Sequence, residues 1–449
     1  MNEKLKLSSH IAIGFMLFAL FFGAGNLIFP AQLGQDAGTN SWQAIAGFLT
    51  TGVTLPLIGI LAIGFSGSNN LQELASRVHP IYGLIFTALL YLSIGPFFAA
   101  PRTATVAYEV GITPFLGNSQ SQLDLFIFSV VFFIIAFLFS LYPAKLVDNI
   151  GKILAPLLVI LLTILLIVAY INPMGSFQAP GEAYESTPYI TGFLEGYHTM
   201  DALASLVFGI IIISIIKVNG ITSRKRIFIE TSKSGIVATM LLGFIYVGIA
   251  LLGASSVETI GLQETGGAVL SQTAYHYFGM LGNVMLAVVI ILACLTTAIG
   301  LIIANAEYFH TLIPRITYGK FVGIFSLLTF TVANFGLTNI ITYSVPVLMI
   351  LYPLAIVIMM LSFLSPIFHH KQLVYVATIA ITFLISIFDG LKELYKSLGY
   401  TDFGWMKPII DLYEKFLPLY EEGLGWIVPA LIVLVVSILL TQIMKITEA

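Results

Sequence analysis

The sequence predicts an all-α integral membrane protein with about twelve transmembrane helices. Hydrophobic residues make up 58% of the chain and charged residues only 9%, whereas soluble domains have roughly 45–50% and about 25%. The apolar residues form long continuous runs, and a helix needs about 20 such residues to cross a bilayer. A membrane β-barrel would instead show short segments in which apolar and polar residues alternate. We therefore expect the chain to be solvated by lipid over most of its surface.

The apolar runs follow one another along nearly the whole chain, so we expect a single transporter domain, 1–449. The first segment, MNEKLKLSSH, carries the charge of a signal peptide, but the apolar stretch behind it is too long for one. We interpret it as part of a first span that is retained. The ninth and tenth spans are divided only by the short segment FGLTN, 335–339. The predicted spans are 10–33, 42–65, 81–110, 123–142, 146–171, 193–217, 235–254, 281–307, 318–335, 338–364, 372–389 and 424–444.

The distribution of lysine and arginine gives the orientation, because cytoplasmic loops carry an excess of both. With the N-terminus in the cytoplasm, fourteen basic residues fall in inner segments, four in an outer loop, 390–423, and one, Arg102, within a span. We therefore expect a multi-pass protein of the cell membrane with both termini in the cytoplasm. The inner residues are Lys4, Lys6, Arg77, Lys145, Lys152, Lys217, Arg224, Lys225, Arg226, Lys233, Arg315, Lys320, Lys371 and Lys445, and the outer ones are Lys392, Lys396, Lys407 and Lys415.

The composition also disfavours several functions. A net charge of −3 gives no support to a nucleic-acid partner, and the single cysteine, Cys294, excludes an internal disulfide or a cysteine metal cluster. The histidines lie mostly near span ends and no phosphate-binding loop is present, so we expect no enzyme, no cofactor and no ATP-hydrolysing subunit. A channel is disfavoured because the polar residues gather at a few points. The expected partners are lipid and a small-molecule substrate.

The first span contains a predicted break in its helix. Gly23 and Gly25 flank Ala24 and precede Asn26 within the apolar run. Glycine costs about 1 kcal/mol relative to alanine inside a helix, and transporters bind solutes where helices are interrupted near the midplane. Close packing through small residues is the alternative, but it does not account for an amide group in hydrocarbon. We therefore predict a functional break at 23–26.

The sixth span has a similar polar group and suggests an internal repeat. Asp201, Ser205 and Gly209 interrupt its apolar run. Spans one and six are five apart, which fits two inverted five-helix repeats, 10–171 and 193–364, with additional helices in 372–444. The outer loop 390–423 contains two amphipathic pieces, which are interpreted either as interfacial helices or as a lid.

Four segments resemble a known family. They are FFGAGNLIFP (21–30), GPFFAAPRTATVAYE (95–109), GYHTMDALASLVFG (196–209) and ACLTT (293–297). Together they resemble the BrnQ-type branched-chain amino acid:cation symporters, which have the leucine-transporter fold of the amino acid–polyamine–cation superfamily. The resemblance implies alternating-access import of leucine, isoleucine and valine coupled to sodium, with a proton-coupled symporter of the same fold as the alternative.

The resemblance also implies a sodium site, since sodium prefers hard oxygen ligands. Its ligands would be the carbonyls of Ala19, Phe22 and Ala293 and the hydroxyls of Thr296 and Thr297. The spacing alone leaves open that each threonine bonds back to its own helix.

One sodium is expected rather than two. Leu203 stands where a second site would need a hydroxyl, and span seven has no asparagine. Proton-driven relatives carry a lysine in span five, where this chain has only Lys152 near the cytoplasmic end. This weakens the proton-coupled alternative.

A zwitterionic solute suits the two broken spans. Its carboxylate fits the positive N-terminal end of a half-helix, here the amides near the first break. Its ammonium fits the carbonyl end of the first half of span six, around Ala202 to Ser205, and its tail would lie in an apolar pocket with Phe208 as a wall. The predicted substrate residues are Gly23, Ala24, Gly25, Asn26, Ala202, Ser205 and Phe208.

Arg102 and Asp201 lie at similar predicted depth, and charges inside a membrane usually pair or face a cavity. We hypothesise that they form an outer gate pair. The alternative is separate partners, with Arg102 bound to Glu109 or to backbone carbonyls and Asp201 bound to water.

Overall fold

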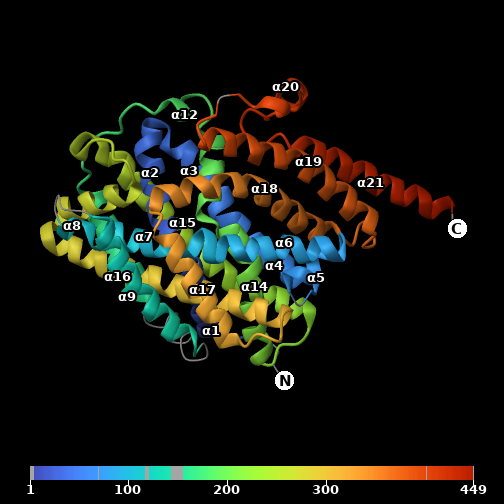
Figure 1. The fold of residues 1–449 in the computed structure, drawn as a ribbon, viewed down its shortest axis with the longest axis horizontal. Coiled ribbons are helices and arrows are strands. Elements are labelled where there is room, and N and C mark those ends of the chain that lie inside the picture. The colour runs from blue at the N-terminus through green and yellow to red at the C-terminus, as the bar shows by residue number, and fades with distance from the viewer. Residues whose placement is uncertain (1–4, 69, 117–120, 143–154, 401, 448–449) are drawn as a thin grey trace.

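The computed structural model describes residues 5–68, 70–116, 121–142, 155–400 and 402–447, and all regular elements within these ranges are helices (Figure 1). Eight helical segments of the described residues are long and apolar enough to cross a bilayer, and four shorter apolar helices accompany them. The all-α membrane fold is therefore confirmed, while the number twelve stays a prediction. Residues 146–154 of the fifth predicted span, with Lys152, lie outside the described residues, as do Lys4 and Lys145.

The first predicted repeat opens with two helices, α1 (Leu7–Phe21) and α2 (Ala24–Ala37), in place of one continuous span. The third predicted span is also interrupted, by a π-helical turn, η3. The remaining elements of this part are η1 (Gly38–Asn40), α3 (Ser41–Leu49), η2 (Thr50–Thr54), α4 (Leu55–Ser66), α5 (Leu71–Ala75), α6 (Pro80–Leu92), η3 (Ser93–Phe97), α7 (Ala99–Gly111), α8 (Thr113–Leu116), α9 (Gln122–Ser140) and α11 (Ala155–Ile171).

The second predicted repeat shows the expected division between spans nine and ten. Gly336 adopts a positive φ of 84° between α17 and α18, a conformation that glycine reaches without strain. The seventh span is longer than predicted, and α16 is bent at Gly279, whose φ of 59° and ψ of −146° are not helical. The elements are α12 (Glu182–Glu185), α13 (Pro188–Glu195), η6 (Gly196–Thr199), α14 (Asp201–Val218), α15 (Arg224–Ile260), α16 (Gly266–Leu312), α17 (Tyr318–Ala333) and α18 (Leu337–Leu364).

Helices of the two parts pack against each other throughout the protein. α2 packs on α15, α7 on α16, and α4 on α14. As a consequence, the breaks in spans one and six lie in the same buried region. Both breaks also face α15 and α16, which come from the second part.

The C-terminal region corrects one prediction. The loop was expected to begin at 390, but α19 (Gln372–Ser397) continues to Ser397 because LKELYKSL extends the helix of span eleven without a breaker. Beyond it lie η7 (Gly404–Met406), α20 (Lys407–Phe416) and α21 (Ile427–Thr447). α18, α19 and α21 pack in sequence along one flank, and α20 lies beside the end of α19 (Figure 1).

Candidate functional site

The break in the first span is formed by glycine and asparagine, as predicted. Gly23 is in an extended conformation and its N–H donates to Asn26 Oδ1 at 2.9 Å. The amide side chain thereby caps α2, whose first N–H groups have no acceptor within the helix. Close packing also holds, because a Cβ added to Gly23 would lie 3.0 Å from the Thr297 side chain. Gly23 therefore lies both at a break and in a close contact, while the function of the break stays a prediction.

The break in the sixth span lies earlier than predicted. Met200 adopts a left-handed conformation with φ 63°, between η6 and α14, so the helix restarts at Asp201. Ala202 and Ser205, predicted at the carbonyl end of the first half, instead occupy the first turns of the second half, and Ser205 Oγ donates to the Ala202 carbonyl at 2.6 Å. A carboxylate is favourable at a helix N-terminus, which explains why α14 begins with Asp201. The carbonyl end of the first half lies at 196–200 instead.

Side chains from three helices join the two breaks, and we call Asn26, Asp201 and Tyr246 the break cluster. Asn26 Nδ2 donates to Asp201 Oδ2 at 2.6 Å, and the Tyr246 hydroxyl donates to the same oxygen at 2.7 Å. Asn26 also contacts the Tyr246 hydroxyl. All three residues are at most 2% exposed. The cluster therefore fixes α2, α14 and α15 around one buried carboxylate.

A cavity of about 30 Å³ adjoins the break cluster, which is room for roughly one water molecule. It is too small for an amino acid, so binding requires neighbouring helices to move apart. Most of the predicted substrate residues line it, together with both predicted gate residues and Thr199, Met200 and Ala204. Those substrate and gate residues are Gly23, Ala24, Gly25, Asn26, Phe208, Arg102 and Asp201.

The five predicted sodium ligands also come together. Thr297 Oγ1 lies 3.4 Å from the Phe22 carbonyl oxygen, and Thr296 Oγ1 lies 2.9 Å from the Ala293 carbonyl oxygen. A second cavity of about 30 Å³, between α1, α11 and α16, is lined by four of the five, Ala19, Phe22, Ala293 and Thr296. Thr296 bonds back to its own helix as the alternative supposes, while Thr297 reaches across to α1. Carbonyl and hydroxyl oxygens are the ligand types that a small hard cation prefers, and the sodium site stays a prediction.

The proposed gate residues line the same cavity but do not pair directly in this structure, and their role as a gate stays a prediction. Among the described residues, no ion pair within 4.0 Å joins Arg102 to Asp201. Within the described ranges, no ion pair joins Arg102 to Glu109, whose carboxylate accepts a hydrogen bond from Thr265. Asp201 has protein partners in the other two residues of the break cluster. Arg102 instead lies over the Phe29 ring, with 5.0 Å between Cζ and the ring centroid.

Sequence reasoning missed two features of the site. The Tyr246 hydroxyl donates to the Asp201 carboxylate from a third helix, and its only signal was a tyrosine in the middle of an apolar span. Span three bends at Gly95, whose ψ of −118° is not helical. A Cβ atom on this residue would lie 2.3 Å from the Asn305 side chain, so glycine leaves space for Asn305. The adjacent Pro96 was the available signal, because proline disrupts a helix interior.

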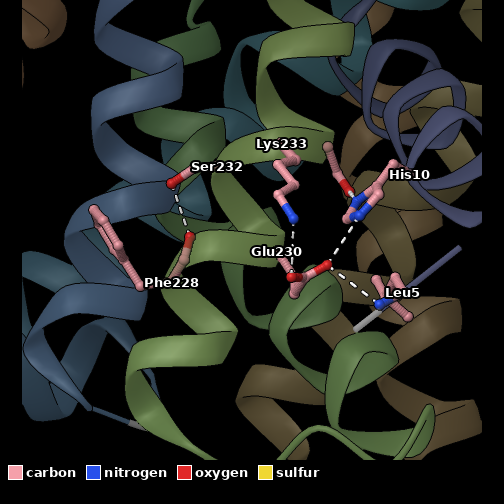
Figure 2. A network of polar contacts seen from close by, with 7 residues as sticks. Leu5, His10, Phe228, Glu230, Ser232 and Lys233 are labelled. Carbon is pink, nitrogen blue, oxygen red and sulfur yellow. Dashed lines mark hydrogen bonds and ion pairs between the residues drawn. The ribbon is translucent and has the colours of Figure 1, made fainter. Parts of the chain in front are cut away.

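A second polar cluster joins the first span to α15 at the end where α1 begins. Glu230 is fully buried; its Oε1 accepts from Lys233 Nζ at 3.1 Å and its Oε2 accepts from the Leu5 N–H at 3.3 Å (Figure 2). His10 Nε2 lies 2.9 Å from Oε2, and His10 Nδ1 lies 3.2 Å from Ser234 Oγ. We call these five residues the α1–α15 cluster. Both oxygens of its carboxylate have partners within the protein.

Comparisons with known proteins agree with this architecture. A family model described as branched-chain amino acid transport protein matches residues 6–444. The branched-chain amino acid permease BrnQ of Bacillus subtilis (strain 168) is 46% identical to this chain over 431 residues, which are 96% of each chain. The branched-chain amino acid permease BraB of the same organism is 47% identical over 441 residues, which are 98% of this chain and 97% of the relative. A solved structure of Mhp1, a nucleobase-cation-symport-1 family transporter, superposes with a TM-score of 0.61 at 13% identity, covering 96% of this chain and 91% of that one. It shares the leucine-transporter fold.

Proposed function

The chain belongs to the family of branched-chain amino acid transport proteins, and we propose that it is a secondary active symporter that imports leucine, isoleucine and valine together with sodium. One observation carries the proposal. Two interrupted spans meet at a cavity lined by one buried cation and one buried carboxylate, and a second cavity at the first break is lined by four of the five predicted sodium ligands. This arrangement suits a zwitterion and a small cation that cross the membrane together.

Coupling has a simple physical basis in one peptide group. The Phe22 carbonyl lies 3.4 Å from Thr297 Oγ1 on the proposed ion side, and the N–H of the same peptide, on Gly23, donates to Asn26 Oδ1 of the break cluster. The peptide is planar and rigid, so an ion that draws the carbonyl toward itself also orients the N–H and the start of α2. Sodium bound at this carbonyl thereby holds the start of α2 in the orientation that binds the solute.

The solute would lie with its charged ends at the two breaks. Its ammonium is attracted to Asp201, and also to the carbonyl end at 196–200. The apolar tail would contact Ala204 and Phe208, which line the cavity. A hydrophobic pocket discriminates a single methylene by only about 1–3 kcal/mol, so leucine, isoleucine and valine should compete for this site.

The energy of one sodium ion suffices for accumulation. A charge that enters across 100 mV releases about 2.3 kcal/mol, and a tenfold sodium gradient adds about 1.4 kcal/mol. The sum of about 3.7 kcal/mol supports roughly 500-fold accumulation of a neutral amino acid. No ATP-hydrolysing subunit is needed.

The test is uptake of labelled leucine into proteoliposomes that contain the purified protein. An inward sodium gradient should drive accumulation above the external concentration, and unlabelled isoleucine and valine should inhibit it. Accumulation driven by a proton gradient without sodium would replace sodium by the proton-coupled alternative, with Asp201 as the candidate carrier of the proton. No leucine accumulation under either gradient would overturn the symport function.

A further inference from the structure

Arg102 is a buried cation whose hydrogen-bonding capacity is not met by the protein. The residue, on α7, is only 2% exposed, and its Nε and Nη1 atoms are buried without a hydrogen-bond partner. A guanidinium carries five N–H donors in a planar fork that matches a carboxylate. Leaving a buried charge uncompensated is strongly destabilising. Among the described residues, nothing accepts a hydrogen bond from these two nitrogen atoms, so the guanidinium is free to bind a further anion.

The guanidinium lies over the N-terminal end of α2. A Cβ placed on Gly25 would be 2.9 Å from Arg102 Nη2, so glycine at this position lets the guanidinium approach the first turn of the helix. The first N–H groups of a helix lack acceptors within it and attract negative charge. Both Gly25 and Arg102 line the cavity beside the break cluster. Two independent groups of donors, one from α2 and one from α7, thus converge on one point.

The carboxylates that could partner Arg102 accept hydrogen bonds from other side chains. Asp201 Oδ2 accepts hydrogen bonds from Asn26 and Tyr246, and Glu109 accepts from Thr265. Asp201 nevertheless lines the same cavity as Arg102. The cavity is therefore bordered by one positive and one negative group that do not pair directly, which is the charge pattern of an α-amino acid.

On these contacts we propose that Arg102, together with the first turn of α2, binds the α-carboxylate of the transported amino acid, while Asp201 binds its ammonium. The proposal rests on the proposed function and deepens it. It replaces a gate made of two protein charges by a clamp that the substrate itself completes. Closure then depends on both charged ends of the substrate, so compounds that lack one end are rejected.

The test compares leucine with leucinamide, which keeps the ammonium and the tail but has no carboxylate. Isothermal titration of each ligand onto purified wild-type protein in sodium should show leucine binding about 100-fold tighter, because the unpaired guanidinium gains a charge-assisted partner only from leucine. In Arg102→Gln, leucine affinity should fall to that of leucinamide, and leucinamide affinity should change less than about twofold. Arg102→Lys should keep part of the preference, since it keeps the charge but loses the fork.

Controls separate recognition from folding. Arg315→Gln removes an exposed arginine far along the chain and should leave the leucine-to-leucinamide ratio unchanged. If Arg102→Gln is not recovered as folded protein, Gly25→Ala serves instead, because its Cβ displaces Arg102 Nη2 and should lower the same ratio. An unchanged ratio in folded Arg102→Gln or Gly25→Ala overturns the clamp. Failure of wild-type protein to bind or accumulate leucine at all overturns the proposed function instead, so the two failures are distinguishable.

Discussion

The break cluster and the α1–α15 cluster both tie the first span to α15, but they differ in how completely their polar atoms are paired. Glu230 in the α1–α15 cluster has protein partners on both carboxylate oxygens. Beside the break cluster, by contrast, Arg102 keeps two buried nitrogen atoms without partners. A buried polar group without a partner is costly. The comparison teaches that the carboxylate of the α1–α15 cluster is satisfied within the protein, whereas the guanidinium beside the break cluster is not, and we propose that a ligand satisfies it.

Asp201→Asn should have the largest effect on transport. It removes the negative charge that faces the ammonium and the oxygen that accepts from Tyr246. We expect leucine uptake to fall at least about 100-fold, or roughly 2.8 kcal/mol. Uptake into proteoliposomes with matched amounts of inserted protein measures this. Asp411→Asn, which changes an exposed carboxylate on α20, is the control; equal uptake by both variants would remove Asp201 from the solute site.

Thr297→Ala should have the second largest effect, and it should weaken the binding of sodium. Its hydroxyl faces the Phe22 carbonyl, so the sodium concentration for half-maximal uptake should rise about tenfold. Thr297→Ser keeps the hydroxyl and should restore most of the sodium dependence. Thr329→Ala, which removes a hydroxyl bonded only to its own helix in α17, is the matched control. A sodium dependence that is identical in all three variants would contradict the proposed ligand.

Substitutions of the two glycines at the first break should separate effects on leucine binding from effects on sodium binding. A Cβ on Gly25 would meet Arg102 and Phe29, while one on Gly23 would meet Thr297. Gly25→Ala should therefore weaken leucine affinity about fivefold with little change in sodium dependence, and Gly23→Ala should do the reverse. Measuring both constants for each variant checks this. The same pattern in both variants would show that the break acts only through packing.

Glu230→Gln should have the smallest effect on the solute site, because its cluster is complete without substrate. The change weakens the tie between α1 and α15 and should expose the cavity more often from that end, while leucine affinity stays within about twofold. A cysteine placed at Leu20, which lines the cavity, in a Cys294→Ala background reports this opening as faster labelling. Lys233→Ala should change labelling less, because Lys233 is 47% exposed and exposed ion pairs contribute little. If the cysteine at position 20 is labelled at the same rate in Glu230→Gln, the α1–α15 cluster does not control opening of the cavity.

The sequence predicted local features of the site better than distant ones. The first break follows from glycines and an asparagine that are neighbours in the chain, and the structure has it there. The restart of span six at Asp201 was missed because nothing in the residue type of Met200 indicates a left-handed backbone.

Tyr246 could not be paired with Asn26 because 220 residues separate them, and one sequence carries no signal for such a contact. The depth of Arg102 and Asp201 was foreseeable from the span limits. Whether their side chains pair directly was not, since this depends on how α7 and α14 pack. The extension of α19 was missed for a simpler reason, because an amphipathic end of a long helix has the same residue pattern as a short interfacial helix.

The central claim is that one ion site organises the solute site through the peptide between Phe22 and Gly23. Leucine titration onto the purified protein, in sodium and in choline of equal ionic strength, tests this claim most directly. Sodium should raise leucine affinity at least about tenfold in the wild-type protein and less than about twofold in Thr297→Ala, since coupling free energies are typically 1–3 kcal/mol. Equal leucine affinity of the wild-type protein in sodium and in choline would contradict the account.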